Sequence, residues 1–115
     1  MEPIYRILSK EVIGNHLKFK VEINPNHPIY EGHFPGMPIV PGAVLLQMVK
    51  ELLESTLNKK LKLKGASNIK FLKMVLPKEA KELEIVLEME EGESLKVKVE
   101  ITMGGDVYCK MGLIY

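Results

Sequence analysis

Alternating apolar and polar side chains predict β-strands over most of this chain. The clearest case is residues 83–90, where leucine, isoleucine and methionine alternate with glutamates. Residues 95–103 repeat the alternation with lysines on the polar side. The two segments are therefore expected to pair across a turn at Glu91–Gly92, with glutamates facing lysines on an exposed surface.

Three other parts of the chain also have strand character. Residues 5–23 predict two strands around a Gly14–Asn15 turn, with alternation strongest in the second half. Residues 69–77 alternate up to a proline, and residues 107–115 follow another glycine turn. We expect the last of these to close an antiparallel sheet.

Residues 24–42 interrupt this pattern. They contain five of the seven prolines and three glycines, a density that prevents both helix formation and continuous ladder pairing. Their remaining residues are largely apolar, whereas a flexible linker is usually polar. This stretch is therefore predicted to be an ordered, partly buried loop.

A helix is predicted from Gly42 to about Asn58. Its first two turns, residues 43–49, are apolar on nearly every side, which predicts burial all round, with the N-terminus deep in the protein. The second half is amphipathic. A single buried helix among strands needs a curved sheet to surround it, so we expect one α+β domain spanning residues 1–115.

Composition excludes several functions. Sixteen basic and fifteen acidic residues give a net charge of +1, unlike a dedicated nucleic-acid binder. The longest stretch free of charged or amide side chains, with histidine counted as neutral, is residues 32–46 and has fifteen residues. A spanning helix needs about 20, so we expect neither membrane insertion nor a signal peptide. The one cysteine, Cys109, suits a reducing cytoplasm. Histidine and cysteine spacing indicates no metal site.

The ten residues from His33 to Gly42 read HFPGMPIVPG. They resemble the active-site segment of the 3-hydroxyacyl-ACP dehydratases of bacterial fatty-acid synthesis (ACP, acyl carrier protein), whose pattern H-F-P-G-x-P-x-x-P-G they match at every fixed position. The resemblance covers residues 16–115 and includes the NIKFLKMVLP segment ending at Pro77. It implies the hotdog fold, a curved antiparallel sheet wrapped around one central helix.

Dehydration of a 3-hydroxyacyl thioester removes a proton from C2 and expels the C3 hydroxyl. The reaction needs a base that titrates near neutral pH and donors for the thioester oxygen. His33 is a suitable base, and Gly42 would place its N–H at the positive end of the predicted helix. The resemblance assigns these same roles, and it implies that the Ile39 carbonyl orients the imidazole.

Gln47 departs from the family pattern, which has Glu or Asp at this position. An amide orients a hydroxyl group but cannot deliver a proton, and loss of a general acid lowers the rate by about 10²–10⁴. His33 alone, Glu51 or Glu31 could substitute. As the only polar residue of the first two helical turns, Gln47 is expected inside the protein. Its partner would be either a substrate hydroxyl or a backbone carbonyl across a dimer interface.

Other residues near the motif are candidates for substrate contacts. Phe34, Met37 and Met48 would contact the acyl chain, although methionines also serve as core filler. A cluster of lysines follows the predicted helix: Lys59, Lys60, Lys62 and Lys64. These lysines are either a solvated helix end or a docking site for acidic acyl carrier protein.

The leading hypothesis is dehydration, or reverse hydration, of (3R)-hydroxyacyl thioesters on acyl carrier protein or coenzyme A, without metal or cofactor, in fatty-acid or related lipid biosynthesis. The resemblance implies a homodimer or higher homo-oligomer, with His33 of one subunit near Gln47 of its mate. Two alternatives stay open. One is a hotdog acyl-thioesterase, and the other is a non-catalytic acyl-thioester binding module.

Overall fold

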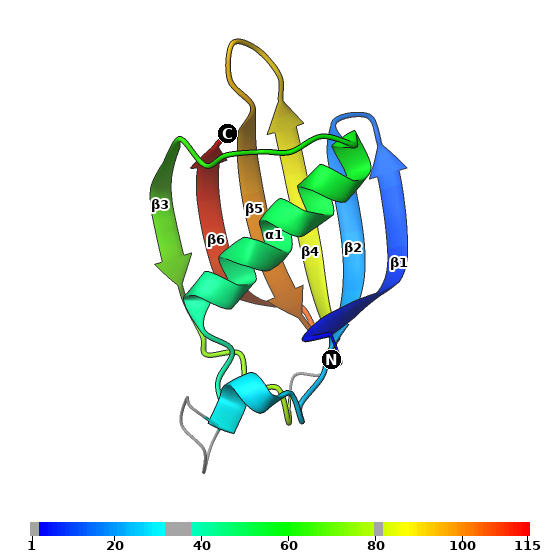
Figure 1. The fold of residues 1–115 in the computed structure, drawn as a ribbon, viewed down its shortest axis with the longest axis vertical. Helices are drawn as coiled ribbons and strands as arrows, with labels where there is room; N and C mark the ends of the chain where they lie inside the picture. The colour runs from blue at the N-terminus through cyan, green and yellow to red at the C-terminus, as the bar shows by residue number, and fades with distance from the viewer. Residues whose placement is uncertain (1–2, 32–37, 80–81) are drawn as a thin grey trace.

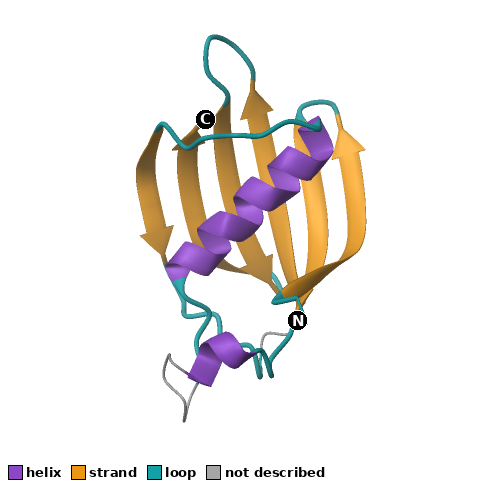
Figure 2. Cartoon of the chain, viewed as in Figure 1, coloured by secondary structure: helices purple, strands orange, loops and turns teal. Residues whose placement is uncertain are grey.

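A computed structural model describes residues 3–31, 38–79 and 82–115. In these residues six strands form one antiparallel sheet, and one long helix crosses one of its faces (Figures 1 and 2). The elements are β1 (Tyr5–Ile13), β2 (His16–Ile23), the 3-10 helix η1 (Pro28–Glu31), α1 (Gly42–Leu57), β3 (Gly65–Phe71), β4 (Glu82–Glu90), β5 (Lys96–Met103) and β6 (Asp106–Ile114). The predicted α+β architecture is confirmed.

The strands lie in the order β1-β2-β4-β5-β6-β3, so β1 and β3 are the two edges. Tight turns join β1 to β2 and β5 to β6. Gly14 has a φ of 59° in the β1–β2 turn, while Gly104 and Gly105 have φ values of 57° and 86° between β5 and β6. The Gly104–Gly105 turn has positive φ at both positions, which matches the twist of a hairpin and which glycine adopts without steric cost.

Residues with special backbone preferences mark both ends of α1. Pro41 precedes the helix with an extended conformation, and Asn58 ends it with a φ of 55°. The Asn58 N–H donates to the Glu54 carbonyl, which satisfies one of the last free helix carbonyls. The helix thus ends one residue before the predicted boundary.

The core lies between α1 and the sheet. The buried helix residues are Leu45, Met48, Val49, Leu52 and Leu53. They pack against inward-facing side chains of the strands, among them Phe19, Ile85 and Ile101, each at most 1% exposed. Burying such side chains stabilises the fold by about 1.5–3 kcal/mol each. No polar or charged residue is buried within the described chain.

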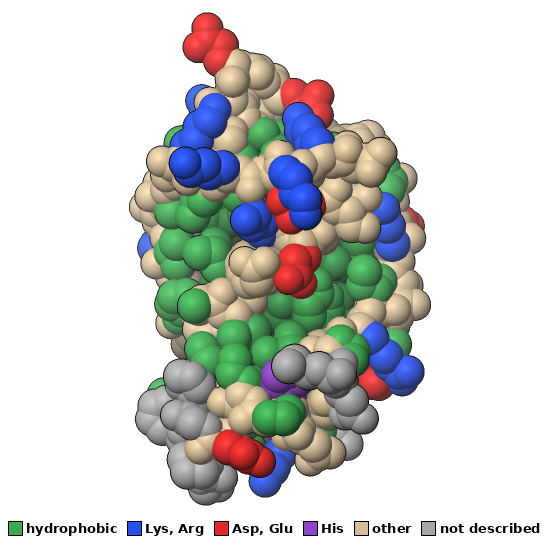
Figure 3. All heavy atoms as spheres, viewed as in Figure 1, with side chains coloured by type: hydrophobic (Ala, Val, Ile, Leu, Met, Phe, Trp, Pro, Cys, Tyr) green, Lys and Arg blue, Asp and Glu red, His purple; other side chains and the backbone are tan. Residues whose placement is uncertain are grey.

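The expectation that the first half of α1 is buried all round is wrong for the single chain. Ala43 and Gln47 are exposed, and Val44 and Leu46 are half-buried. The reason is that one sheet covers only one side of the helix, and nothing in this chain's described residues covers the other (Figure 2). Hydrophobic side chains remain visible on both sides of α1 and around its N-terminal end (Figure 3).

The strand predicted at residues 69–77 differs as well. β3 instead spans Gly65–Phe71, with an irregular register between Ser67 and Lys70. Beyond β3, the N–H groups of Leu72 and Lys73 both donate to the Tyr108 carbonyl. Two successive N–H groups converging on one acceptor turn the chain away from the ladder, which alternation alone does not predict. In the described residues neither helix has the length and apolar character needed to span a membrane.

Candidate active site

The N-terminus of α1 presents free backbone donors. The N–H groups of Val44 and Leu45 both donate to the Pro41 carbonyl, at 3.0 and 3.2 Å. Those of Gly42 and Ala43 have no acceptor among the described residues, and no side chain caps the helix. These two N–H groups lie at the positive end of the helix, so they could stabilise negative charge on a thioester oxygen.

The side chain of Phe71 lies beside this helix start. A Cβ atom built on Gly42 would lie 2.6 Å from Cζ of Phe71, too close for any real contact. Phe71 itself is 56% exposed. The end of β3 and the first residue of α1 therefore form one side of the site, with a glycine where the ring approaches.

The loop before α1 is tied to the segment after β3. The Val40 N–H donates to the Val75 carbonyl at 2.9 Å, and both side chains are buried. Ile39 is half-buried beside them, and none of the described residues donates to its carbonyl. This carbonyl can therefore accept a hydrogen bond from the imidazole of His33, as the resemblance implies.

Three sequence-predicted site residues, His33, Phe34 and Met37, lie outside the described residues. Glu31 is exposed at the end of η1. Met48, proposed as an acyl contact, is 1% exposed and belongs to the core between helix and sheet.

Gln47 lies on the exposed side of α1, contrary to the expected interior position. Its Nε2 donates to Oε2 of Glu51, one turn along the helix, at 3.1 Å. The other carboxylate oxygen, Oε1, accepts a hydrogen bond from the Tyr5 hydroxyl at 2.8 Å. Within this chain the partner of Gln47 is thus a carboxylate of its own helix.

Tyr5 was missed by sequence reasoning. It belongs to β1 and lies 46 positions from Glu51, so no local pattern relates the two residues. Burial, together with the hydrogen bond to Glu51 and the charge of that residue, raises the pKa of Tyr5 well above its ordinary value of 10.0. Tyr5 therefore stays a hydroxyl donor across the physiological pH range.

Other charged groups lie away from this site. The cluster Lys59, Lys60, Lys62 and Lys64 is exposed and follows the C-terminal end of α1. A groove of about 830 Å³ lies on the opposite face of the sheet and is lined by side chains such as Glu88, Lys98 and Lys110. Among the described residues, no group of three or more His, Cys, Asp or Glu could hold a metal ion.

Comparison with known sequences relates the chain to dehydratases. The ApeI-like family, described as ApeI dehydratase, matches residues 9–111. The 3-hydroxyacyl-[acyl-carrier-protein] dehydratase FabZ of Haemophilus influenzae (strain 86-028NP) is 29% identical over 109 residues, which cover 88% of this chain and 74% of the relative. FabZ of Rickettsia massiliae (strain Mtu5) is 27% identical over 93 residues, or 74% of this chain and 64% of that protein. The match thus spans about two thirds to three quarters of these relatives.

Solved structures share the fold. The dehydratase heterocomplex ApeI:P from Xenorhabdus doucetiae has a TM-score of 0.71 at 17% identity and covers 99% of this chain and 97% of its own. A mutant thioesterase from Pseudomonas aeruginosa has a TM-score of 0.63 at 10% identity, covering 96% and 78%. The hotdog fold is therefore confirmed. Because dehydratases and thioesterases share it, the fold alone does not decide the reaction.

Proposed function

The chain belongs to the ApeI-like dehydratase family, and from this premise we propose that it dehydrates (3R)-hydroxyacyl thioesters to enoyl thioesters, or hydrates them in reverse. The observation that carries the proposal is the N–H of Gly42 at the start of α1, which has no acceptor among the described residues. Gly42 is the last residue of the HFPGMPIVPG segment, which begins at His33, so a base and an oxyanion donor come from one continuous stretch of chain.

In the proposed reaction His33 takes a proton from C2 of the substrate. The Gly42 N–H donates to the thioester oxygen as negative charge develops there. The C3–O bond then breaks, and the imidazolium of His33 returns its proton to the departing hydroxyl, which leaves as water. The histidine ends as it began, so no cofactor is required. Gln47 would hold the C3 hydroxyl, because an amide accepts and donates hydrogen bonds without changing its protonation.

We also propose a homodimer that pairs the free edge of β3 with β3 of a second copy. β3 is an edge strand whose residues are largely exposed, and the apolar residues at and after it include Ile69, Phe71 and Met74, at 37%, 56% and 66% exposed. An uncovered edge of this kind favours pairing with another strand. Phe71 also borders Gly42, so pairing here would bring the second copy beside the site.

For the carrier we propose acyl carrier protein, with a coenzyme A thioester as the other candidate. The cluster Lys59, Lys60, Lys62 and Lys64 is exposed, and its positive charge suits an acidic partner. α1 has 16 residues, which places the cluster about 24 Å from Gly42 in the same chain.

For the cell compartment we propose a reducing cytoplasm, which suits the free, buried thiol of Cys109.

One steady-state assay tests the reaction. Purified chain is given a 3-hydroxyacyl-ACP, and enoyl absorbance and free thiol are followed together. Enoyl product without thiol release supports the dehydratase. The His33→Ala variant gives the background rate of the assay. Thiol release would support the thioesterase instead, and binding without turnover would support the acyl-thioester binding module. Near-normal dehydration by folded His33→Ala would contradict the assigned base.

A further inference from the structure

Three side chains from two distant parts of the chain form a hydrogen-bonded network on the open side of α1. Tyr5 comes from β1, while Gln47 and Glu51 are one helical turn apart. The Tyr5 hydroxyl donates to Oε1 of Glu51 at 2.8 Å, and Nε2 of Gln47 donates to Oε2 at 3.1 Å. We refer to these three residues as the Tyr5–Glu51–Gln47 network.

The network fixes which way the Gln47 amide points. A carboxylate only accepts hydrogen bonds, so Gln47 must turn its NH₂ group, and not its carbonyl oxygen, toward Glu51. Its Oε1 and its second N–H are then directed elsewhere, and no described residue bonds to them. An exposed glutamine without such a partner samples many rotamers, and ordering it has an entropic cost. Here the order is present before any ligand arrives.

The same bonds bear on whether Glu51 replaces the acid that the family has at position 47. Both of its carboxylate oxygens accept hydrogen bonds, one from Tyr5 and one from Gln47. Protonating a substrate would require Glu51 to give up one of these bonds. Its geometry therefore suits a residue that holds Gln47 better than one that reacts with the substrate.

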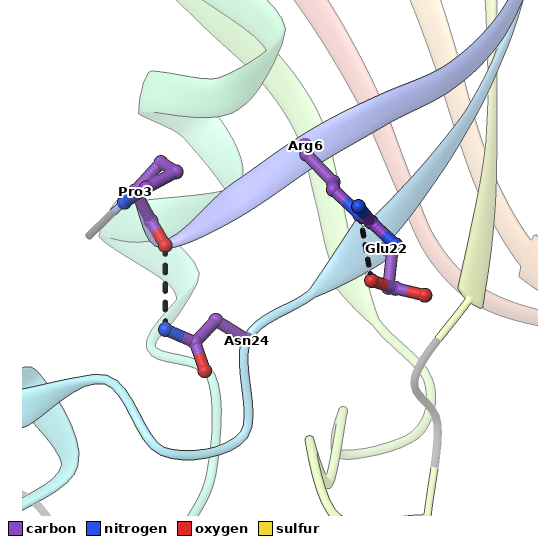
Figure 4. Close-up of polar contacts among 4 residues, drawn as sticks. All are labelled: Pro3, Arg6, Glu22 and Asn24. Carbon is purple, nitrogen blue, oxygen red and sulfur yellow. Dashed lines mark hydrogen bonds and ion pairs between the residues drawn. The ribbon is translucent and has the colours of Figure 1, made fainter.

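The backbone around Tyr5 is itself held in place. Tyr5 pairs with Ile23 across the β1–β2 ladder. Just beyond, the Asn24 N–H donates to the Ile4 carbonyl at 2.9 Å, and the Asn24 side-chain amide donates to the Pro3 carbonyl at 3.5 Å (Figure 4). Arg6 and Glu22 form an ion pair of 2.8 Å on the next rung (Figure 4). Tyr5 thus projects from a fixed strand toward the side chain of Glu51 on α1.

We propose that Glu51 and Tyr5 are positioning residues, which orient the Gln47 amide to bind the C3 hydroxyl of the substrate or, in the reverse direction, the attacking water. The inference rests on the proposed function. It explains how a site with an amide in place of the family's carboxyl group controls the leaving hydroxyl. It also assigns Tyr5, which lies outside the motif, to the site.

A double-mutant cycle tests the proposal. Glu51→Ala and Tyr5→Phe should each lower kcat/KM, by about tenfold and about threefold, mostly through kcat, since misplacing a reacting group raises the barrier. In the Gln47→Ala background the same changes should have no further effect, because the residue through which they act is gone. Equal losses in both backgrounds would overturn the proposal. Glu11→Gln changes an exposed acid on β1 whose side chain has no hydrogen-bond partner among the described residues. It is the charge control and should keep full activity.

A second readout does not depend on turnover. Gln47 is the only glutamine in the chain, so selective ¹⁵N labelling gives a single side-chain NH₂ pair in an NMR spectrum. One of its two protons should move upfield in Glu51→Ala and, by a smaller amount, in Tyr5→Phe, with the backbone spectrum retained. Unmoved signals would overturn the network. If the wild-type chain lacks dehydratase activity while these signals do shift, the proposed function fails and the orientation of Gln47 stands.

Discussion

The ring of Phe71, the last residue of β3, lies against Gly42, the first residue of α1. A Cβ at position 42 would be 2.6 Å from Cζ and 3.1 Å from Cε1 of that ring. The backbone of Gly42 does not need positive φ, so the reason for glycine here is space. The contact joins the sheet edge to the helix terminus whose N–H is proposed to bind the thioester oxygen.

Gly42→Ala should therefore impair activity more than stability. The Phe71 ring is 56% exposed and can swing away from the new methyl group. The gain in helix propensity, about 1 kcal/mol, offsets the lost contact, so the free energy of unfolding should change by less than about 1 kcal/mol. Because the methyl and the displaced ring crowd the N–H, kcat/KM should fall about tenfold.

Thermal unfolding and steady-state kinetics check both halves of this prediction. Gly92→Ala is the matched control, since its nearest neighbour within 4 Å is the Ser94 carbonyl oxygen at 3.8 Å. Unchanged kcat/KM in Gly42→Ala would mean that the space beside the N–H is not used by the substrate.

Cys109 should be unreactive in the folded chain. Its side chain is fully buried, and burial raises the pKa of the thiol from 9.0 to about 11. Only the thiolate reacts with Ellman's reagent. We expect negligible labelling at pH 8 in the native state and complete labelling in guanidinium. Rapid native labelling would contradict the packing around β6.

Because of the same thiol, the free energy of unfolding should depend on pH in the alkaline range. The pKa of the Cys109 thiol is raised in the folded state. Its contribution to the free energy of unfolding is therefore fully present below the unfolded-state pKa of 9.0 and is lost as pH rises toward about 11. The unfolding free energy of the wild type should fall across that interval more steeply than that of Cys109→Ala. Equal slopes would count against this linkage.

Much of the fold follows from local pattern. In the β4–β5 hairpin, Leu87 and Val99 face the core as their alternation predicts. Glu88 stands opposite Lys98, as the facing charges predict. The β3 boundary could not be predicted, because it depends on Leu72 and Lys73 donating to the distant Tyr108 carbonyl.

The site was predictable only where it is local in sequence. The motif ending at Gly42 places the helix start correctly, since proline and glycine there restrict the backbone. The exposure of Gln47 was not predictable, because it depends on how far a single sheet reaches around α1. Tyr5 could not be inferred from any spacing, since its contact with Glu51 spans 46 positions.

Ile69→Lys should convert the proposed dimer to a monomer. Ile69 is 37% exposed on β3, so the monomer tolerates a charge there, while two lysines brought together at a paired edge would repel. Sedimentation at micromolar concentration should give a dimer for the wild type and a monomer for the variant. Ile13→Lys, at a 64% exposed site on the other edge strand, is the control and should stay dimeric. A monomeric wild type, or dissociation of Ile13→Lys alone, would refute pairing through β3.

Exchanging the two helix side chains should separate the role of the amide from that of the missing acid. Gln47→Glu alone places two carboxyl groups one turn apart and removes the N–H that Glu51 accepts. The neighbouring charge raises the pKa of the new carboxyl group. The contribution of this carboxyl group to the free energy of unfolding is then fully present at low pH and is lost as pH rises through the raised pKa. We expect this variant to be less stable and less active than the wild type above neutral pH, and to recover as the pair shares a proton at lower pH.

The double variant Gln47→Glu/Glu51→Gln restores the missing hydrogen-bond donor, which now comes from position 51. The amide at position 51 can donate to the new carboxylate while its oxygen still accepts from Tyr5, whose hydroxyl remains protonated because its pKa is raised. The carboxyl group then occupies the position at which the resembling dehydratases carry theirs. Dehydration should exceed that of Gln47→Glu at every pH above neutral, and should exceed the wild type by about tenfold if a positioned acid limits the rate. Profiles of kcat/KM against pH for the wild type, Gln47→Glu and the double variant on one 3-hydroxyacyl-ACP decide the matter. If the double variant were as impaired as Gln47→Glu, an oriented amide at position 47 would be what this site requires, and His33 would have to carry both proton transfers alone.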